Sequence, residues 1–272
     1  MREWWMLGSL WALDVPIVAL CWGTLIASFL GITLVTMGPM MLLFGMVWAY
    51  TLTTRVVHAM LGRNTHYAQY YREHAFPMLM LALCALLSSV WLLLFEVGRY
   101  LLIFMLVPLS MVIIAHAPLC KRIPYYTDFT LAASFIFACS VPAFYYSFRF
   151  SPIHMLTNAH LWCLVCLFTV FNLERKNSLN TEQEGEERQS LVILGILLLL
   201  FLPGACKVIS AQSSPYEQFF YCTLCIGAVS VHSICRLRHV LSRESWYCVS
   251  WTAMALPAIL GILHQAPSIW WY

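Results

Sequence analysis

The chain has few charged residues for its length. Asp, Glu, Lys and Arg together occupy 10% of its 272 positions, whereas apolar and aromatic residues occupy 61%, and the mean hydropathy is +0.77. A soluble domain of this size would need a much more polar surface, so the composition excludes one. The sequence therefore predicts that the chain lies in a lipid bilayer.

Several sequence signals are also missing. The sequence shows no internal repeat and no matching pair of broken helices, which leaves an inverted-repeat transporter unsupported. No small-residue cleavage site closes the first apolar stretch, so we expect the first helix to be retained. The two C-x-x-C pairs, Cys163 with Cys166 and Cys222 with Cys225, lie within apolar stretches. Structural zinc sites place such pairs in loops, so we interpret these thiols as small apolar residues.

Long apolar runs divide the chain into membrane spans. A helix needs roughly 20 apolar residues to cross the hydrocarbon core. By this criterion we expect an all-α polytopic membrane protein with about nine transmembrane helices, forming a single domain over residues 1–272. The expected spans are Leu10–Leu34, Gly38–Met60, Phe76–Phe95, Tyr100–Leu119, Asp128–Ser147, Ile153–Leu173, Ser190–Ile209, Tyr216–Arg236 and Trp246–Leu263.

The basic residues alternate between the two sides of these spans. With nine crossings, twelve of the fifteen Lys and Arg residues fall on the side of the N-terminus, and Arg99, Arg149 and Lys207 fall on the other. Because basic residues are retained on the cytoplasmic face, we expect the N-terminus inside and the C-terminus outside. The same asymmetry explains the formal net charge of +3 without nucleic acid as a partner.

Polar residues near the cytoplasmic ends of the helices are the candidates for function. Thr51, Thr54, Arg55 and His58 recur at three- and four-residue spacing, so we expect them to share one face of their helix. Polar groups are costly in lipid, and they usually line a cavity or mark a functional site. The alternative for any single cation is an anchor at the membrane interface or a contact with a lipid head group.

Two further places on the same side carry such groups. The fourth loop holds Lys121 and Arg122, and the sixth helix ends with Asn172, Glu174 and Arg175. Residues 174–189 continue as a polar acidic segment, which we interpret as a solvated cytoplasmic loop. Cations from the second and fourth loops and a carboxylate from the sixth thus converge on one membrane face. Such a set suits a phosphorylated lipid.

Three isolated polar residues have simpler interpretations. Asp14, which lies just before Pro16, is interpreted as the N-cap of the first helix. We interpret His232 or His160 as a hydrogen-bonding residue between helices.

Three stretches resemble the UbiA superfamily of intramembrane prenyltransferases, whose members have nine transmembrane helices and an inside N-terminus. The first is Leu10–Arg55, where Leu13–Val15 opens the first helix and Tyr50–His58 closes the second. The second is Tyr70–His74, and the third is Lys121–Pro124, followed by Asn172–Arg175 after the sixth helix. They are similar to a divergent bacterial branch of the family, which implies residence in a bacterial cytoplasmic membrane. The resemblance extends over nearly the whole chain in architecture, and it implies a UbiA-like helical bundle.

The resemblance implies transfer of a prenyl group from a prenyl diphosphate to a hydrophobic acceptor, with Mg²⁺ as the cofactor of an active enzyme. The residues that it assigns to substrate binding are Arg55, Lys121, Arg122 and Asn172, and those that it assigns to catalysis are Glu174 and His58. Family members hold magnesium on Asp-rich motifs in the second and sixth loops, and this chain has no Asp in either loop. The alternative is therefore a non-catalytic member that binds an isoprenoid or quinone-like lipid, or a membrane partner.

Overall fold

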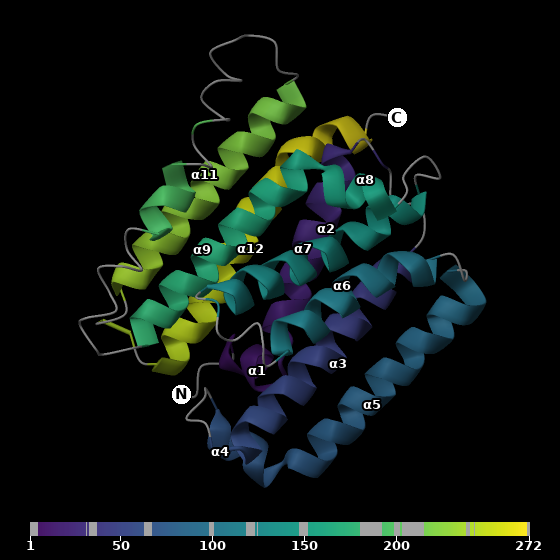
Figure 1. Cartoon of the computed structure of the whole chain (residues 1–272), viewed down its shortest axis with the longest axis vertical. Helices are drawn as coiled ribbons and strands as arrows, with labels where there is room; N and C mark the ends of the chain where they lie inside the picture. Colours follow the sequence, from purple (N-terminus) through teal and green to yellow (C-terminus); the bar gives the residue numbers. More distant parts are fainter. Residues whose placement is uncertain are drawn as a thin grey trace.

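A computed structural model of the chain describes residues 5–30, 32, 37–62, 67–97, 101–117, 123, 125–146, 152–179, 192–198, 202, 215–237, 240–241 and 243–270. All regular secondary structure within these ranges is helical (Figure 1), which confirms the predicted all-α class. Gly38–Met60, Ala75–Phe95 and Tyr126–Tyr145 are long and apolar enough to cross a membrane. Shorter apolar helices accompany these three in the described ranges.

Most of the described helices coincide with apolar runs, as expected where a backbone in lipid must satisfy its own N–H and C=O groups. The helices are α1 (Trp5–Leu10), α2 (Asp14–Phe29), α3 (Gly38–Met60), α4 (Ala68–Glu73), α5 (Ala75–Leu92), α6 (Leu101–His116), α7 (Tyr126–Tyr146), α8 (Pro152–Thr157), α9 (Ala159–Leu179), α11 (Pro215–Arg236) and α12 (Arg243–Trp270). One turn of π-helix, Leu93–Val97, extends α5. Residues 192–198, within the seventh expected span, are also helical.

The expected helix bounds hold best where a strong signal marks the end of a helix. The bounds of α3 match the expectation at both ends, since Gly38 and Pro39 open the helix. The first expected span begins at Leu10, whereas α2 begins at Asp14, after a turn in which Ala12 has a φ of +56°. The expected span Ile153–Leu173 is divided into α8 and α9. Asn158 caps α9, because its Oδ1 accepts a hydrogen bond from the backbone N–H of His160 at 3.0 Å.

Helix α9 runs further than the sequence indicated. It continues to Leu179, so the first six residues of the expected loop 174–189 are helical. The rest of that loop lies outside the described residues.

Helix α2 lies at the centre of the bundle. It packs against α3, α7, α11 and α12, and Trp22 on its surface is fully buried. The indole Nε1–H of Trp22 donates a hydrogen bond to the backbone carbonyl of Met254 on α12 at 2.9 Å. This bond joins two helices that are far apart in the sequence.

Helix α5 lies at the edge of the bundle and packs mainly on α3 (Figure 1). Its other side exposes large apolar side chains, among them Leu83, Leu87 and Trp91. In water such a continuous apolar face would favour aggregation, whereas in a bilayer it contacts lipid chains. The arrangement therefore suits a membrane-embedded bundle.

Candidate functional site

A cavity of about 550 Å³ lies between α3, α6, α7 and α9, with further contacts from α2 and α12. Its lining is apolar on α6 and on the inner turns of α7, where Pro108, Leu109 and Phe135 contribute. Its lining is polar at the C-terminal end of α3 and where α7 begins and α9 ends. From Met46 to His58 the cavity follows α3 for about 18 Å, at 1.5 Å per residue.

The polar wall on α3 matches the face expected from the sequence. Thr51, Thr54, Arg55 and His58 all line the cavity, so their predicted shared face is confirmed. The two threonine hydroxyls are used locally: Thr51 Oγ1 donates to the carbonyl of Val47 at 2.7 Å, and Thr54 Oγ1 donates to a carbonyl one turn earlier. Because both hydroxyl protons are bonded within α3, this face is less polar toward the cavity than its sequence indicates.

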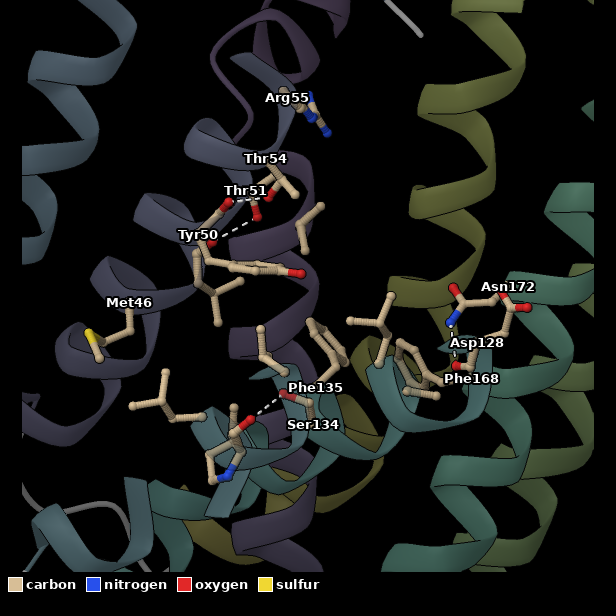
Figure 2. A pocket seen from close by; sticks show the side chains of 18 of the residues that line it. Met46, Tyr50, Thr51, Thr54, Arg55, Asp128, Ser134, Phe135, Phe168 and Asn172 are labelled. Carbon is tan, nitrogen blue, oxygen red and sulfur yellow. Dashed lines mark hydrogen bonds between the residues drawn. The ribbon is translucent and has the colours of Figure 1, made fainter. Parts of the chain in front are cut away.

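Helices α7 and α9 form the facing wall (Figure 2). Asn172 Nδ2 donates to the backbone carbonyl of Asp128 at 3.2 Å. The Asp128 carboxylate also pairs with the ammonium group of Lys176 at 3.0 Å. The Lys176 side chain is half-exposed and the Asp128 side chain is largely buried, which places this ion pair where the cavity meets the outside.

Arg175 adds a second cation to this wall. Its guanidinium carbon lies 5.5 Å from the ring centre of Phe171 and 5.4 Å from that of Trp251. Both distances are within the range of a cation–π contact. The two rings hold the guanidinium in place at the polar end of the cavity.

Arg55 also belongs to a buried cluster beside the cavity. Its Nη2 lies 2.7 Å from each carboxylate oxygen of Asp14, and its Nη1 donates to the carbonyl of Ser9 and to the hydroxyl of Tyr71. The prediction that Asp14 is an N-cap is wrong, because Leu13 occupies that position without a side-chain cap. Contact of both carboxylate oxygens with a buried guanidinium nitrogen outweighs a single bond to a backbone N–H.

Glu174 lies outside the described lining of this cavity, and its assigned catalytic role stays a prediction. Glu174 Oε1 lies 3.0 Å from His232 Nδ1 on α11, and Glu174 is not among the residues that line the cavity. The reason is helical geometry: Asn172, Arg175 and Lys176 are three and four residues apart and share a face, whereas Glu174 is rotated away from it. The prediction that His232 joins two helices is confirmed.

The structure brings together Arg55, His58 and Asn172 from the predicted set, and their functional roles stay predictions. Lys121 and Arg122 lie outside the described residues. Four lining residues that sequence reasoning did not select are Tyr50, Asp128, Lys176 and Trp251. The spacing from Asn172 was enough to indicate Lys176, but no spacing rule links α9 to residues on other helices.

The described lining does not fit a magnesium site. Among the described residues of the cavity, Asp128 supplies the one carboxylate, and Lys176 already pairs with it. No group of three His, Cys, Asp or Glu side chains in the described ranges could hold a metal ion. Magnesium takes several oxygen ligands in near-octahedral geometry, which this set does not provide.

Comparisons of the chain with family models, with curated proteins and with solved structures found no significant match.

Proposed function

We propose that this protein is an integral membrane protein that binds an isoprenoid lipid with an anionic head group. One observation carries the proposal: a cavity of about 550 Å³ is apolar along α6 and α7 and ends among cationic side chains from α3 and α9. Ligand sites are typically apolar clefts in which a few polar groups fix the orientation. An amphiphile would place its chain on the apolar side and its head at the polar end.

The head group would lie against α9. Lys176 and Arg175 occupy this end of the cavity, and His58 faces it from α3. Arg55 contributes less directly, because Asp14 already neutralises it. Arg175 is the strongest candidate for a phosphate contact, since a guanidinium can make two parallel hydrogen bonds to phosphate oxygens.

The proposal of an isoprenoid chain rests on the family resemblance, and that of the membrane arrangement rests on the pattern of basic residues. The resemblance to the UbiA superfamily favours a prenyl diphosphate as the ligand, in a nine-span bundle with the N-terminus inside a bacterial cytoplasmic membrane. The polar ends of α3 and α9 and the start of α7 would then all face the cytoplasm. A water-soluble diphosphate made in the cytoplasm would reach the cavity from that side.

Transfer of the prenyl group to a hydrophobic acceptor is a second candidate function. Cationic groups at the end of the cavity favour this function, because they would stabilise the departing diphosphate. The apolar lining would exclude water from the reacting prenyl group. Release of diphosphate distinguishes this function from binding alone.

The test is to incubate the purified full-length protein in lipid nanodiscs with labelled farnesyl diphosphate, with and without a chelator. We expect saturable binding that weakens as the salt concentration rises. Arg175→Met keeps an apolar stem against Phe171 and Trp251 but removes the charge, so it should weaken binding about tenfold or more.

Arg72→Met is the matched control, because Arg72 is an exposed arginine on α4 outside the cavity lining. It should bind like the wild type. Absence of binding by the wild type, or equal affinity of the Arg175→Met variant, would contradict the proposal. Diphosphate release together with a labelled prenylated acceptor would establish the transfer reaction, whereas release with farnesol as the product would indicate hydrolysis.

A further inference from the structure

Asp128 places a carboxylate in a cavity whose other charged residues, among those described, are the cations Arg55, Arg175 and Lys176. The Asp128 side chain is 15% exposed, and its Oδ2 atom accepts a hydrogen bond from Lys176 Nζ at 3.0 Å. Figure 2 shows Asp128 beside Asn172 on the wall that faces α3. A group with the same charge as an anionic ligand thus lies directly against one of the cations that would bind it.

The length of this ion pair limits how far such a ligand can lie from Asp128. A charge-assisted hydrogen bond from an ammonium group to an oxyanion is about 2.8 Å long. While the pair stays closed, a phosphate oxygen bonded to Lys176 Nζ therefore lies within about 6 Å of Asp128 Oδ2. Two negative charges at this distance repel each other, and solvent screens a largely buried carboxylate only weakly. An anion binds Lys176 either against this repulsion or by displacing the carboxylate.

Both members of the pair remain stabilised when they separate. Asp128 lies in the first turn of α7, at the positive end of the helix dipole, and Lys176 lies in the last turn of α9, at the negative end. The Lys176 side chain is also half-exposed, so its ammonium group can turn away from α7 and stay hydrated. Arg55 and Asp14 are only 11% and 6% exposed and have no such freedom. Of these two ion pairs beside the cavity, the one between Asp128 and Lys176 is the pair that a ligand can open.

We infer that Asp128 is an exchangeable counter-anion of the head-group site, and that an anionic head group displaces it from Lys176 on binding. In the empty cavity the carboxylate neutralises the ammonium group. It lowers the affinity for anionic ligands, and it promotes their release because it can pair with Lys176 again. The inference rests on the proposed function, and it adds to the cations that favour binding a residue that opposes it.

The experiment measures the affinity of Asp128→Asn for farnesyl diphosphate and for farnesol, with the full-length protein in nanodiscs and a chelator present. Asparagine keeps the size of the side chain and removes its charge. We expect Asp128→Asn to bind farnesyl diphosphate about tenfold more tightly than the wild type, and to bind farnesol with unchanged affinity. Asp128→Glu retains the carboxylate and should bind farnesyl diphosphate like the wild type. A purely structural role of Asp128 would instead weaken the binding of both ligands in the Asp128→Asn variant.

Glu73→Gln is the matched control for the change in net charge. Glu73 is an exposed residue of α4 that accepts a hydrogen bond from Gln69, and it lies outside the cavity lining. The variant loses one negative charge, as Asp128→Asn does, but should bind farnesyl diphosphate like the wild type. Equal gains in the two variants would mean that the net charge of the protein, and not the position of Asp128, determines the affinity.

A second measurement needs no substitution at Asp128. The chain has three lysines, Lys121, Lys176 and Lys207, so reductive methylation with isotope-labelled formaldehyde introduces few magnetic resonance signals and keeps the positive charges. The Lys176 signal, assigned with a Lys176→Arg variant, should shift when farnesyl diphosphate is added and should not shift with farnesol. This readout tests the exchange even if Asp128→Asn fails to fold.

The two proposals fail separately. If neither the wild type nor Asp128→Asn binds farnesyl diphosphate, the proposed function is contradicted and this inference falls with it. If the wild type binds but Asp128→Asn binds equally well or more weakly, only the inference is overturned. A Lys176 signal that bound diphosphate leaves unchanged would overturn it as well.

Discussion

Arg55 and Asp14 are a charged pair that is nearly removed from solvent. Their side chains are 11% and 6% exposed, and Arg55 Nη2 contacts both carboxylate oxygens at 2.7 Å. Loss of one partner would leave an uncompensated charge inside the bundle. We therefore expect Asp14→Ala to destabilise the fold by about 3–5 kcal/mol. Thermal unfolding of the purified protein in detergent, followed by circular dichroism, measures this loss.

Lys176→Gln is the corresponding control for an ion pair near the surface. The Lys176 side chain is 52% exposed and the Asp128 side chain 15%, so loss of this bond should cost less than loss of the buried pair, about 1–2 kcal/mol. A destabilisation of similar size in the two variants would show that the buried cluster is not a special source of stability.

The residues of the site differ in how far the sequence could predict them. The shared face of Thr51 and His58 followed from helical spacing and is confirmed. The pairing of Arg55 with Asp14 was missed, because the two residues are 41 positions apart and no local pattern joins them. Glu174 was assigned to the cavity from its position along α9, although the rotation of the helix places it against His232. Depth in the membrane is readable from sequence, whereas contacts between helices are not.

Helices α3 and α5 approach closely at Gly45. A methyl group at this position would overlap Ser89 Oγ and lie 3.3 Å from the carbonyl oxygen of Ala85. Small residues at such contacts let two membrane helices pack tightly. Gly45→Ala should therefore destabilise the protein by about 1–3 kcal/mol. Unfolding in detergent tests this change as well.

Ser89→Ala separates the steric effect from other consequences of the change. The Ser89 hydroxyl bonds to its own helix at Ala85, so its removal alone should cost less than about 1 kcal/mol. In the double variant Gly45→Ala with Ser89→Ala, at least half of the lost stability should return. No recovery would mean that the overlap at Ser89 is not the cause.

The helices themselves were predicted more reliably than their interruptions. Hydropathy alone placed α3 and α11 to within a residue at each end, since charge or proline borders these runs. The turn between α1 and α2 was missed because Trp11, Ala12 and Leu13 are all apolar and carry no turn signal. Its conformation depends on contacts with other helices, as in the hydrogen bond from Trp48 Nε1 to the Trp11 carbonyl.

At the scale of the whole molecule, the cavity combines residues from helices that run in opposite directions. The end of α3, the beginning of α7 and the end of α9 meet at one end of the bundle (Figure 1). The C-terminal ends of α3 and α9 lie on the same side if the chain crosses the membrane an even number of times between them. The alternation of charge in the sequence predicts the same arrangement for this half of the molecule.

The membrane topology after α9 can be tested by finding on which side of the membrane the C-terminus lies. If the seventh expected span, Ser190–Ile209, crosses the membrane, nine crossings place Tyr272 outside. Alkaline phosphatase fused after Tyr272 should then be active in a bacterial host, and green fluorescent protein fused there should not fluoresce. The same reporters fused after Lys176 should give the opposite pattern, because the end of α9 is expected inside. Fluorescence at both positions would mean that the stretch over residues 190–209 does not cross, and would reverse the expected orientation of α11 and α12.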